Sequence, residues 1–252
     1  MLWFTPKCPV DDETREWIDN AFQWLIDELG IGVLREREIV LPTEEYFPDP
    51  YNGSRVSIRR MLDRVCGFMD VDPSLIEIRF FENSDSSRFH PLAAGESSER
   101  HALGTYQMRR DGKYAISLDT TQAANPEMMV ATIAHELGHV ILLGEGRLSE
   151  DYEDHEPMTD LVTVFYGLGI FNANSSFVFE QFTNAQFQGW RAGSAGYLSE
   201  EMFGYALALF AYLRKESKPK WTIHLSTNVK SYFKSSSKYL NKTEGLPFTK
   251  YI

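Results

Sequence analysis

Two histidines and a glutamate stand at metal-binding spacing in an apolar stretch of the chain. Residues 130–143 read Val-Ala-Thr-Ile-Ala-His-Glu-Leu-Gly-His-Val-Ile-Leu-Leu, which places the reactive groups at His135, Glu136 and His139. On a helix, residues four apart lie on one face, so both imidazoles can reach a single metal ion. Two neutral imidazoles suit Zn²⁺, and the adjacent carboxylate can take a proton from water that zinc has bound. We therefore predict one zinc ion, with Glu136 as the general base.

The residues around this motif predict the helix that must carry it. Asn125 and Pro126 form a typical helix start, and Gly144 stands where a helix stop is expected. The remaining faces of this helix are apolar, so we expect it to be buried. Buried histidines and a buried glutamate need partners, and a metal ion would supply them. The alternative is a buried helix whose two histidines are satisfied by neighbouring polar groups.

This stretch resembles the active-site helix of the zincin metallopeptidases. Metzincins extend the motif with a glycine and a third histidine, but Leu142 and Glu145 occupy those positions here. Gluzincins take a glutamate from the next helix and an acid four residues later, a spacing that Glu156 and Asp160 match. The resemblance covers residues 113–170 and implies an α+β zincin-like fold that hydrolyses peptide bonds. The His-Glu-Leu-Gly-His core also resembles short cytoplasmic peptidases that cleave regulatory proteins.

Position favours Glu156 as the third zinc ligand. Five side chains compete for the role: Glu145, Asp151, Asp154, His155 and Glu156. A residue before proline is pushed out of helical geometry, and Pro157 favours a helix start, so Glu156 should stand at the beginning of a helix. Asp160 would lie one turn deeper on the same face, where it can accept the second ring N–H of His135. His155 is the main rival, since imidazole is a good zinc ligand.

The rest of the chain predicts an α+β protein with a small mixed sheet and a mostly helical C-terminal half. Hydrophobic periodicity and capping residues predict helices and strands that alternate along the chain. The expected helices span 12–29, 54–69, 157–168 and 199–213, and the expected strands span 38–42, 75–81, 102–108 and 113–119. We expect loops at 83–100 and at 172–176, and we assign no structure to 177–198.

Two of the strands are expected to form a hairpin beside the metal helix. Asp111 and Gly112 separate the strands at 102–108 and 113–119, and Asp-Gly between extended segments is a strong hairpin signal. In zincins, an edge strand of the sheet pairs with the extended substrate. Residues 114–118 are the candidate for that edge, and the alternative is an inner strand with no substrate role.

Composition divides the chain into two parts. Residues 1–216 would form the zincin-like domain, and residues 217–252 a Lys-rich helical extension. From residue 215 onward there are eight Lys and two acidic residues, a net +6, which leaves −17 for the rest of a chain of net charge −11. We expect the extension to dock its apolar stripe on the acidic domain, because a basic region without arginine is a weak signal for nucleic-acid binding.

Composition also bounds the cellular setting. We find no signal peptide and no apolar run of the roughly 18 residues that a membrane span needs. Two cysteines, Cys8 and Cys66, make no disulfide framework, so we expect a cytoplasmic protein. Cys8 lies in Pro-Lys-Cys-Pro, which faintly resembles the cysteine switch of matrix metalloproteinases; an ordinary N-terminal cysteine is the simpler interpretation.

Together these features predict a zinc metallopeptidase that acts on a protein or peptide. Zinc would be bound by His135, His139 and Glu156, with Asp160 supporting a ligand histidine. The residue that stabilises the transition state is left open between Tyr197, Tyr205 and others, as is the oligomeric state. Two alternatives remain: a zinc-binding regulatory or interaction module without turnover, and a hydrolase of non-peptide substrates.

Overall fold

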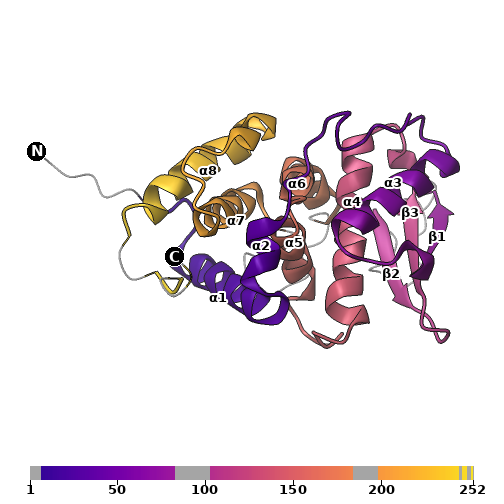
Figure 1. The fold of residues 1–252 in the computed structure, drawn as a ribbon, viewed down its shortest axis with the longest axis horizontal. Helices are drawn as coiled ribbons and strands as arrows, with labels where there is room; N and C mark the ends of the chain where they lie inside the picture. The colour runs from indigo at the N-terminus through magenta and orange to yellow at the C-terminus, as the bar shows by residue number, and fades with distance from the viewer. Residues whose placement is uncertain (1–6, 83–102, 184–197, 244–245, 249–250, 252) are drawn as a thin grey trace, which may run out of the picture.

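A computed structural model describes residues 7–82, 103–183, 198–243, 246–248 and 251 (Figure 1). In these residues the chain is α+β, with eight α-helices and one three-stranded sheet. The helices are α1 (Asp12–Leu29), α2 (Ile31–Glu36), α3 (Arg55–Phe68), α4 (Pro126–His139), α5 (His155–Phe165), α6 (Gly169–Thr183), α7 (Glu200–Leu213) and α8 (Thr227–Leu240). Figure 1 shows the sheet, α3 and α4 at one end, α1, α7 and α8 at the other, and α5 and α6 between them.

The sheet contains β1 (Ile76–Phe81), β2 (Gly104–Met108) and β3 (Tyr114–Asp119), in the order β1-β3-β2. β3 pairs in parallel with β1 and antiparallel with β2. The predicted hairpin is present, and Gly112 takes the positive φ of 79° that its turn requires. The predicted edge at Tyr114–Leu118 is wrong, because β1 pairs along the other side of β3. Within the described sheet the edges are β1 and β2, and β2 packs against α4.

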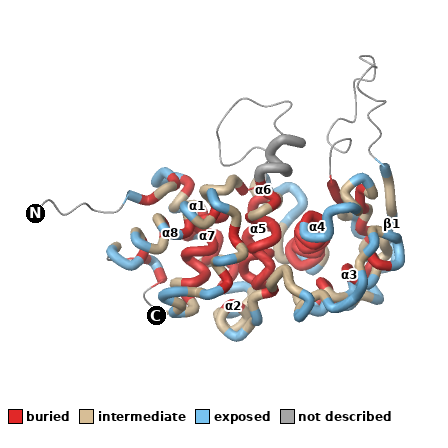
Figure 2. The backbone as a smooth tube through the Cα atoms, turned by 90° about the horizontal axis from the view of Figure 1, so that it is seen from above, coloured by how far each residue is buried: buried red, intermediate tan, exposed pale blue. Residues whose placement is uncertain are grey.

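The helices that carry the motif residues are the most buried part of the protein. In Figure 2 α4, α5 and α7 are buried along most of their length, and exposed residues gather at the periphery. α4 contacts α3, α5, α6 and β2, so it is enclosed on several sides. After His139 it continues as a π-helical turn, Val140–Gly144, which ends where the stop was predicted.

The Lys-rich region contains α8, which packs along α7. The two helices approach closely at Gly204, where an added Cβ would stand 2.3 Å from Cβ of Tyr232. Val229, Phe233 and Leu240 of α8 are buried, while Lys234 and Lys238 are exposed. The division at residue 216 itself stays a prediction. No helix in the described residues is both long and apolar enough to cross a bilayer.

Two predicted elements are wrong, and a third is present with shifted bounds. Residues 38–42 form no strand, and Val40 N–H bonds to the Gly167 carbonyl. Residues 172–176 are not a loop but part of α6, because their polar groups find partners, as when Asn174 bonds to His224 and Ser226. The helix expected at 157–168 begins two residues earlier and ends at Phe165, since Gly167 leaves helical geometry with φ 82°. The loop expected at 83–100 lies outside the described residues.

Candidate metal centre

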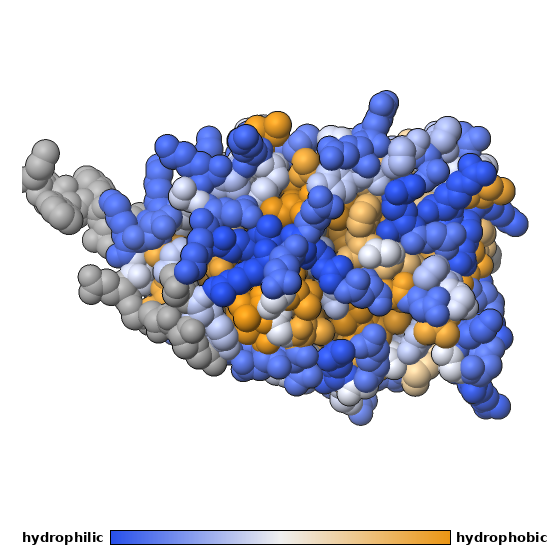
Figure 3. Space-filling view, viewed as in Figure 1, coloured by the Kyte–Doolittle hydropathy of each residue, from blue (hydrophilic) through white to orange (hydrophobic). Residues whose placement is uncertain are grey.

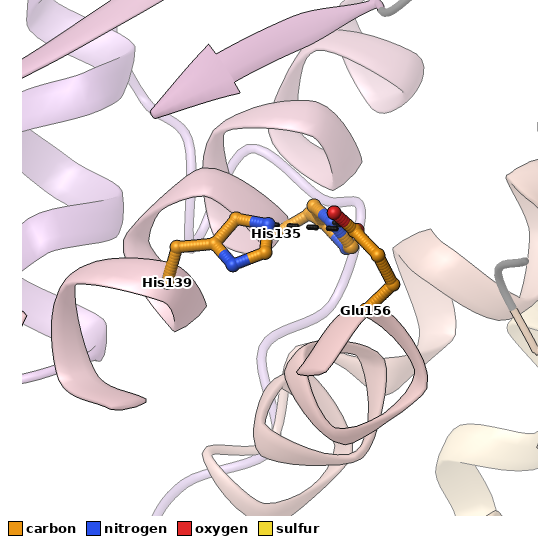
Figure 4. Close-up of side chains that lie close together, drawn as sticks. All are labelled: His135, His139 and Glu156. Atoms are coloured by element: carbon orange, nitrogen blue, oxygen red, sulfur yellow. Dashed lines mark hydrogen bonds and ion pairs between the residues drawn. The ribbon is translucent and has the colours of Figure 1, made fainter. Parts of the chain in front are cut away.

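His135, His139 and Glu156 converge at the contact between α4 and α5 (Figure 4). Glu156 Oε2 lies 2.9 Å from Nε2 of His135 and 3.5 Å from Nε2 of His139. One ligand atom from each residue lies within 4.8 Å of the others, so this group could hold a metal ion. Both histidines are buried, and the Glu156 side chain is 30% exposed, which leaves one side of the group open.

His135 is oriented by Asp160. Its Nδ1 lies 2.9 Å from Asp160 Oδ1, and Asp160 Oδ2 accepts the backbone N–H of Leu198 at 2.8 Å. A carboxylate has no proton to donate, so Nδ1 of His135 carries the hydrogen. The Nε2 lone pair then points at Glu156. The expected contact between Asp160 and His135 is therefore present, and Leu198 is an additional partner that the sequence did not reveal.

His139 is oriented by Thr159, a residue that the sequence analysis did not assign to the site. The Thr159 hydroxyl donates to the His155 carbonyl at 2.7 Å, so it can only accept from Nδ1 of His139, 3.2 Å away. Thr159 follows Glu156 by three residues, so helical spacing could have indicated it. The approach of the two helices here depends on Gly138, because an added Cβ would stand 2.6 Å from Thr159 Cγ2.

The arrangement of acceptors calls for a cation. With Nδ1 protonated in both rings, two Nε2 lone pairs face a carboxylate oxygen at 2.9 and 3.5 Å. A proton or a metal ion must lie between them. Burial opposes a charge on His135, but hydrogen bonds and charges from Asp160 and Glu156 raise its pKa well above the usual range. When protons form the bridge, burial likewise opposes a charge on Glu156, but hydrogen bonds from both histidines hold its pKa well below the usual range.

The spacing of the ligand atoms fits a tetrahedral metal. Bonds of about 2.0–2.1 Å in a tetrahedral site place ligand atoms about 3.3 Å apart. The two measured separations, 2.9 and 3.5 Å, lie on either side of this value. The donor set of two imidazoles and one carboxylate is one that Zn²⁺ and neighbouring transition metals accept. These two separations are therefore compatible with a metal ion held by the three residues.

Glu136 lies beside the group but is not part of it. It is 3% exposed, and its Oε2 has no hydrogen-bond partner in the described part of the chain. Burial raises the pKa of Glu136 to about 8, and the nearby Glu156 charge adds to this while a charged His135 opposes it. Gly104 of β2 lies directly over it, since an added Cβ would stand 2.5 Å from Glu136 Oε1. A buried carboxyl with an unused oxygen is suited to accept a proton.

β2 and the start of α5 complete the surroundings. The ring of Tyr106, two residues after Gly104, stacks on His139 with ring centres 5.9 Å apart. The His155 ring lies 5.7 Å from that of His139, and its Nδ1 is buried without a hydrogen bond among the described residues. Because residues two apart share one face of a strand, β2 turns Gly104 and Tyr106 toward the motif helix together.

The rival ligands lie elsewhere. Glu145 pairs with Arg147 at 2.8 Å, and Asp151 is exposed. Asp154 accepts the indole N–H of Trp17 at 2.9 Å and precedes α5. His155 is close, but its Nδ1 is 3.6 Å from Glu156 Oε1, and it is outside the three-residue group.

Two other expectations concern the surroundings of the site. Tyr205 is fully buried and donates to Asp19 at 2.8 Å, so its hydroxyl is engaged between α1 and α7. Tyr197 lies outside the described residues. The Cys8 thiol is buried near Arg15 and Asp19, and burial raises its pKa to about 11. A thiol that stays protonated is a poor zinc ligand.

Comparisons of the chain with protein families, with curated proteins and with solved structures gave no match. The assignment of a function therefore rests on the geometry of the residues alone.

Proposed function

We propose that the protein is a zinc-dependent peptidase of the zincin type. The observation that carries the proposal is an open group of three ligands beside a buried carboxyl that has an unused oxygen. Zinc bound by His135, His139 and Glu156 would polarise a peptide carbonyl and lower the pKa of water. Peptide-bond hydrolysis needs such an electrophile and a base next to it.

The chain's own residues then have distinct roles. Asp160 and Thr159 hold Nδ1 of the two ligand histidines, so that each Nε2 stays available. Glu136 accepts the proton of the attacking water at Oε2 and delivers it to the leaving amine nitrogen. The Glu136 side chain is enclosed between its own helix, α4, and Gly104 of β2, which limits the access of solvent to that proton. Burial raises the pKa of Glu136, which makes its carboxylate a stronger base for this proton.

β2 supports a peptide as the substrate. It is an edge strand of the described sheet, and it runs past Glu136 and His139. An extended peptide can pair with a free strand edge through backbone hydrogen bonds, whatever its side chains. Such pairing would hold a scissile carbonyl near the ligand group. We therefore favour a peptide or protein segment over a small ester or amide.

A purely structural zinc site is the main alternative. Such sites are usually closed by four protein ligands. Among the described His, Cys, Asp and Glu residues only three form the group, and the neighbouring Glu136 would have no role in a structural site. This difference favours catalysis over an interaction module.

The test combines metal analysis with cleavage of a peptide library. Wild-type protein should bind one zinc ion and cleave peptides, and Glu136→Gln should keep the zinc but lose turnover on the order of 10²-fold or more. Glu45→Gln, an exposed residue outside the group, is the matched control and should behave as wild type. Stoichiometric zinc without any cleavage by the wild type would favour the structural alternative. Full turnover by Glu136→Gln would refute the proposed base.

A further inference from the structure

A cavity lies away from the metal centre, under the loop that joins α2 to α3. Its volume is about 270 Å³, close to the lower end of the usual range for small-molecule pockets, about 300 Å³. Its floor is apolar. It is formed by Phe47 of the loop, Met61 of α3, Val130 of α4 and Phe171 of α6. Val130 lies on α4, five residues before His135, which turns it about 140° from the ligand face. The cavity therefore shares a helix with the metal centre but opens in another direction.

The walls of this cavity are held in place by contacts of their own. Phe47 packs edge-on against Phe171 and against Phe68, with ring centres 5.6 and 5.9 Å apart. The Tyr51 hydroxyl donates to the Ala123 carbonyl at 3.0 Å, and Arg64 of α3 pairs with Asp49 in the loop. Figure 3 shows that apolar surface lies between hydrophilic borders on one face of this molecule. A preformed apolar cavity costs little ordering when a ligand enters.

Polar groups at the cavity indicate the charge of the ligand. Glu44 and Glu127 stand at its rim, exposed, and neither pairs with a basic side chain in the described part of the chain. Asp49 is already neutralised by Arg64, so the rim carries two uncompensated negative charges. Thr43 also lines the cavity, but its hydroxyl oxygen is buried beneath the cavity surface, so the rim carboxylates are the groups that set the charge a ligand meets.

We propose that this cavity binds a small organic cation: an ammonium group on an apolar body of about one aromatic ring. The body would contact Phe47, Met61 and Phe171. The ammonium would lie at the rim between Glu44 and Glu127. Aromatic faces attract cations in addition to the carboxylates, and both features disfavour an anion. This binding does not depend on zinc or on peptide hydrolysis.

The test uses three probes that share a phenyl ring: 2-phenylethylamine, 2-phenylethanol and 3-phenylpropanoate. Titration is followed by NMR of the Met61 and Val130 methyl groups in the full chain, with and without zinc. The amine should bind with a Kd on the order of 1 mM and the carboxylate at least fivefold more weakly, with the alcohol between them. A cavity selective only for apolar shape would bind all three equally, which would overturn the cationic assignment.

Variants locate the binding groups. Glu44→Gln with Glu127→Gln should weaken the amine about three- to tenfold and leave the alcohol unchanged. Glu36→Gln with Glu45→Gln removes the same charge outside the cavity and should change neither. Equal losses in both double variants would reduce the effect to net charge, and no methyl shifts with any probe would exclude the site.

Discussion

The orienting partners of the two ligand histidines should contribute unequally to metal binding. Asp160 is a buried, charged acceptor 2.9 Å from His135, while Thr159 is a neutral hydroxyl 3.2 Å from His139. Hydrogen bonds to charged groups are stronger than neutral ones. We therefore expect replacement of Asp160 to cost more zinc affinity than replacement of Thr159.

The geometry gives the size of each effect. Asp160→Asn keeps the shape, but an amide can accept only one of the two N–H groups that Asp160 now accepts, from His135 and Leu198. Its own NH₂ must then face the other donor, which costs about 1–3 kcal/mol. Loss of such a partner typically weakens metal binding by roughly 10–100-fold. Thr159→Val removes one neutral hydrogen bond to His139, worth about 0.5–1.5 kcal/mol, or roughly two- to tenfold.

The assay is competition for zinc against a chelator of known affinity, with urea unfolding of the zinc-free variants alongside. Zinc affinity should fall at least threefold more in Asp160→Asn than in Thr159→Val. Asp151→Asn, an exposed acid in the same connector, is the control and should match wild type. If Asp160→Asn binds zinc as tightly as wild type, or if Thr159→Val is the more damaging change, the assigned orientation of His135 is refuted.

Three further perturbations test neighbouring contacts. Gly138→Ala would set a Cβ 2.6 Å from Thr159 Cγ2, so it should lower stability by about 1–3 kcal/mol and weaken zinc binding; adding Thr159→Ser, which removes that methyl, should restore most of both in urea and zinc titrations. Gly104→Ala would place a Cβ against Glu136 Oε1, so kcat for peptide cleavage should fall roughly tenfold or more while metal analysis still finds zinc. An unchanged kcat would show that the contact with β2 does not position Glu136 as the base. Burial raises the pKa of Asp19 from 3.8 to about 6, so the folded state keeps a proton that the unfolded state loses, and stability from this group falls as the pH rises from 4 to 6. Relative to Asp19→Asn, the wild type should therefore lose about 2 kcal/mol of unfolding free energy across that window, and parallel pH profiles in chemical denaturation would contradict the assignment.

Local signals predicted most of the helices. α1, α3 and α7 begin within one residue of the prediction because Asp11, Ser54 and Ser199 each accept a backbone N–H in the first turn. Gly30 ends α1 as expected and takes a φ of 88°. Where the residues that start and stop a helix satisfy its terminal groups themselves, the sequence is sufficient.

The errors arose where distant contacts decide the local structure. Asn172 reads as a loop residue, yet its amide donates to the Ala131 carbonyl on α4, and so it is tolerated inside a buried helix. Residues 38–42 are rich in strand-forming side chains, but among the described residues their backbone bonds to Gly167 and Thr43 rather than to a neighbouring strand. Which strands lie at the edges of the sheet depends on the side of β3 along which β1 pairs. No pattern within a single segment carries that information.

The metal centre was predictable to the extent that it lies on single helix faces. Each of the two helices presents positions i, i+3 and i+4 to the other: His135, Gly138 and His139 on α4, and Glu156, Thr159 and Asp160 on α5. Spacing along each helix indicated the three residues that could hold a metal ion, because periodicity fixes which residues share a face. The contact between the middle positions, Gly138 and Thr159, depends on how the two helices pack, which spacing along one helix does not predict. A glycine on α4 leaves room for the threonine on α5, and this close approach brings Glu156 within reach of both histidines. A larger residue at position 138 would hold the helices apart. The site therefore requires the glycine inside the motif as well as the three residues that could hold the metal ion.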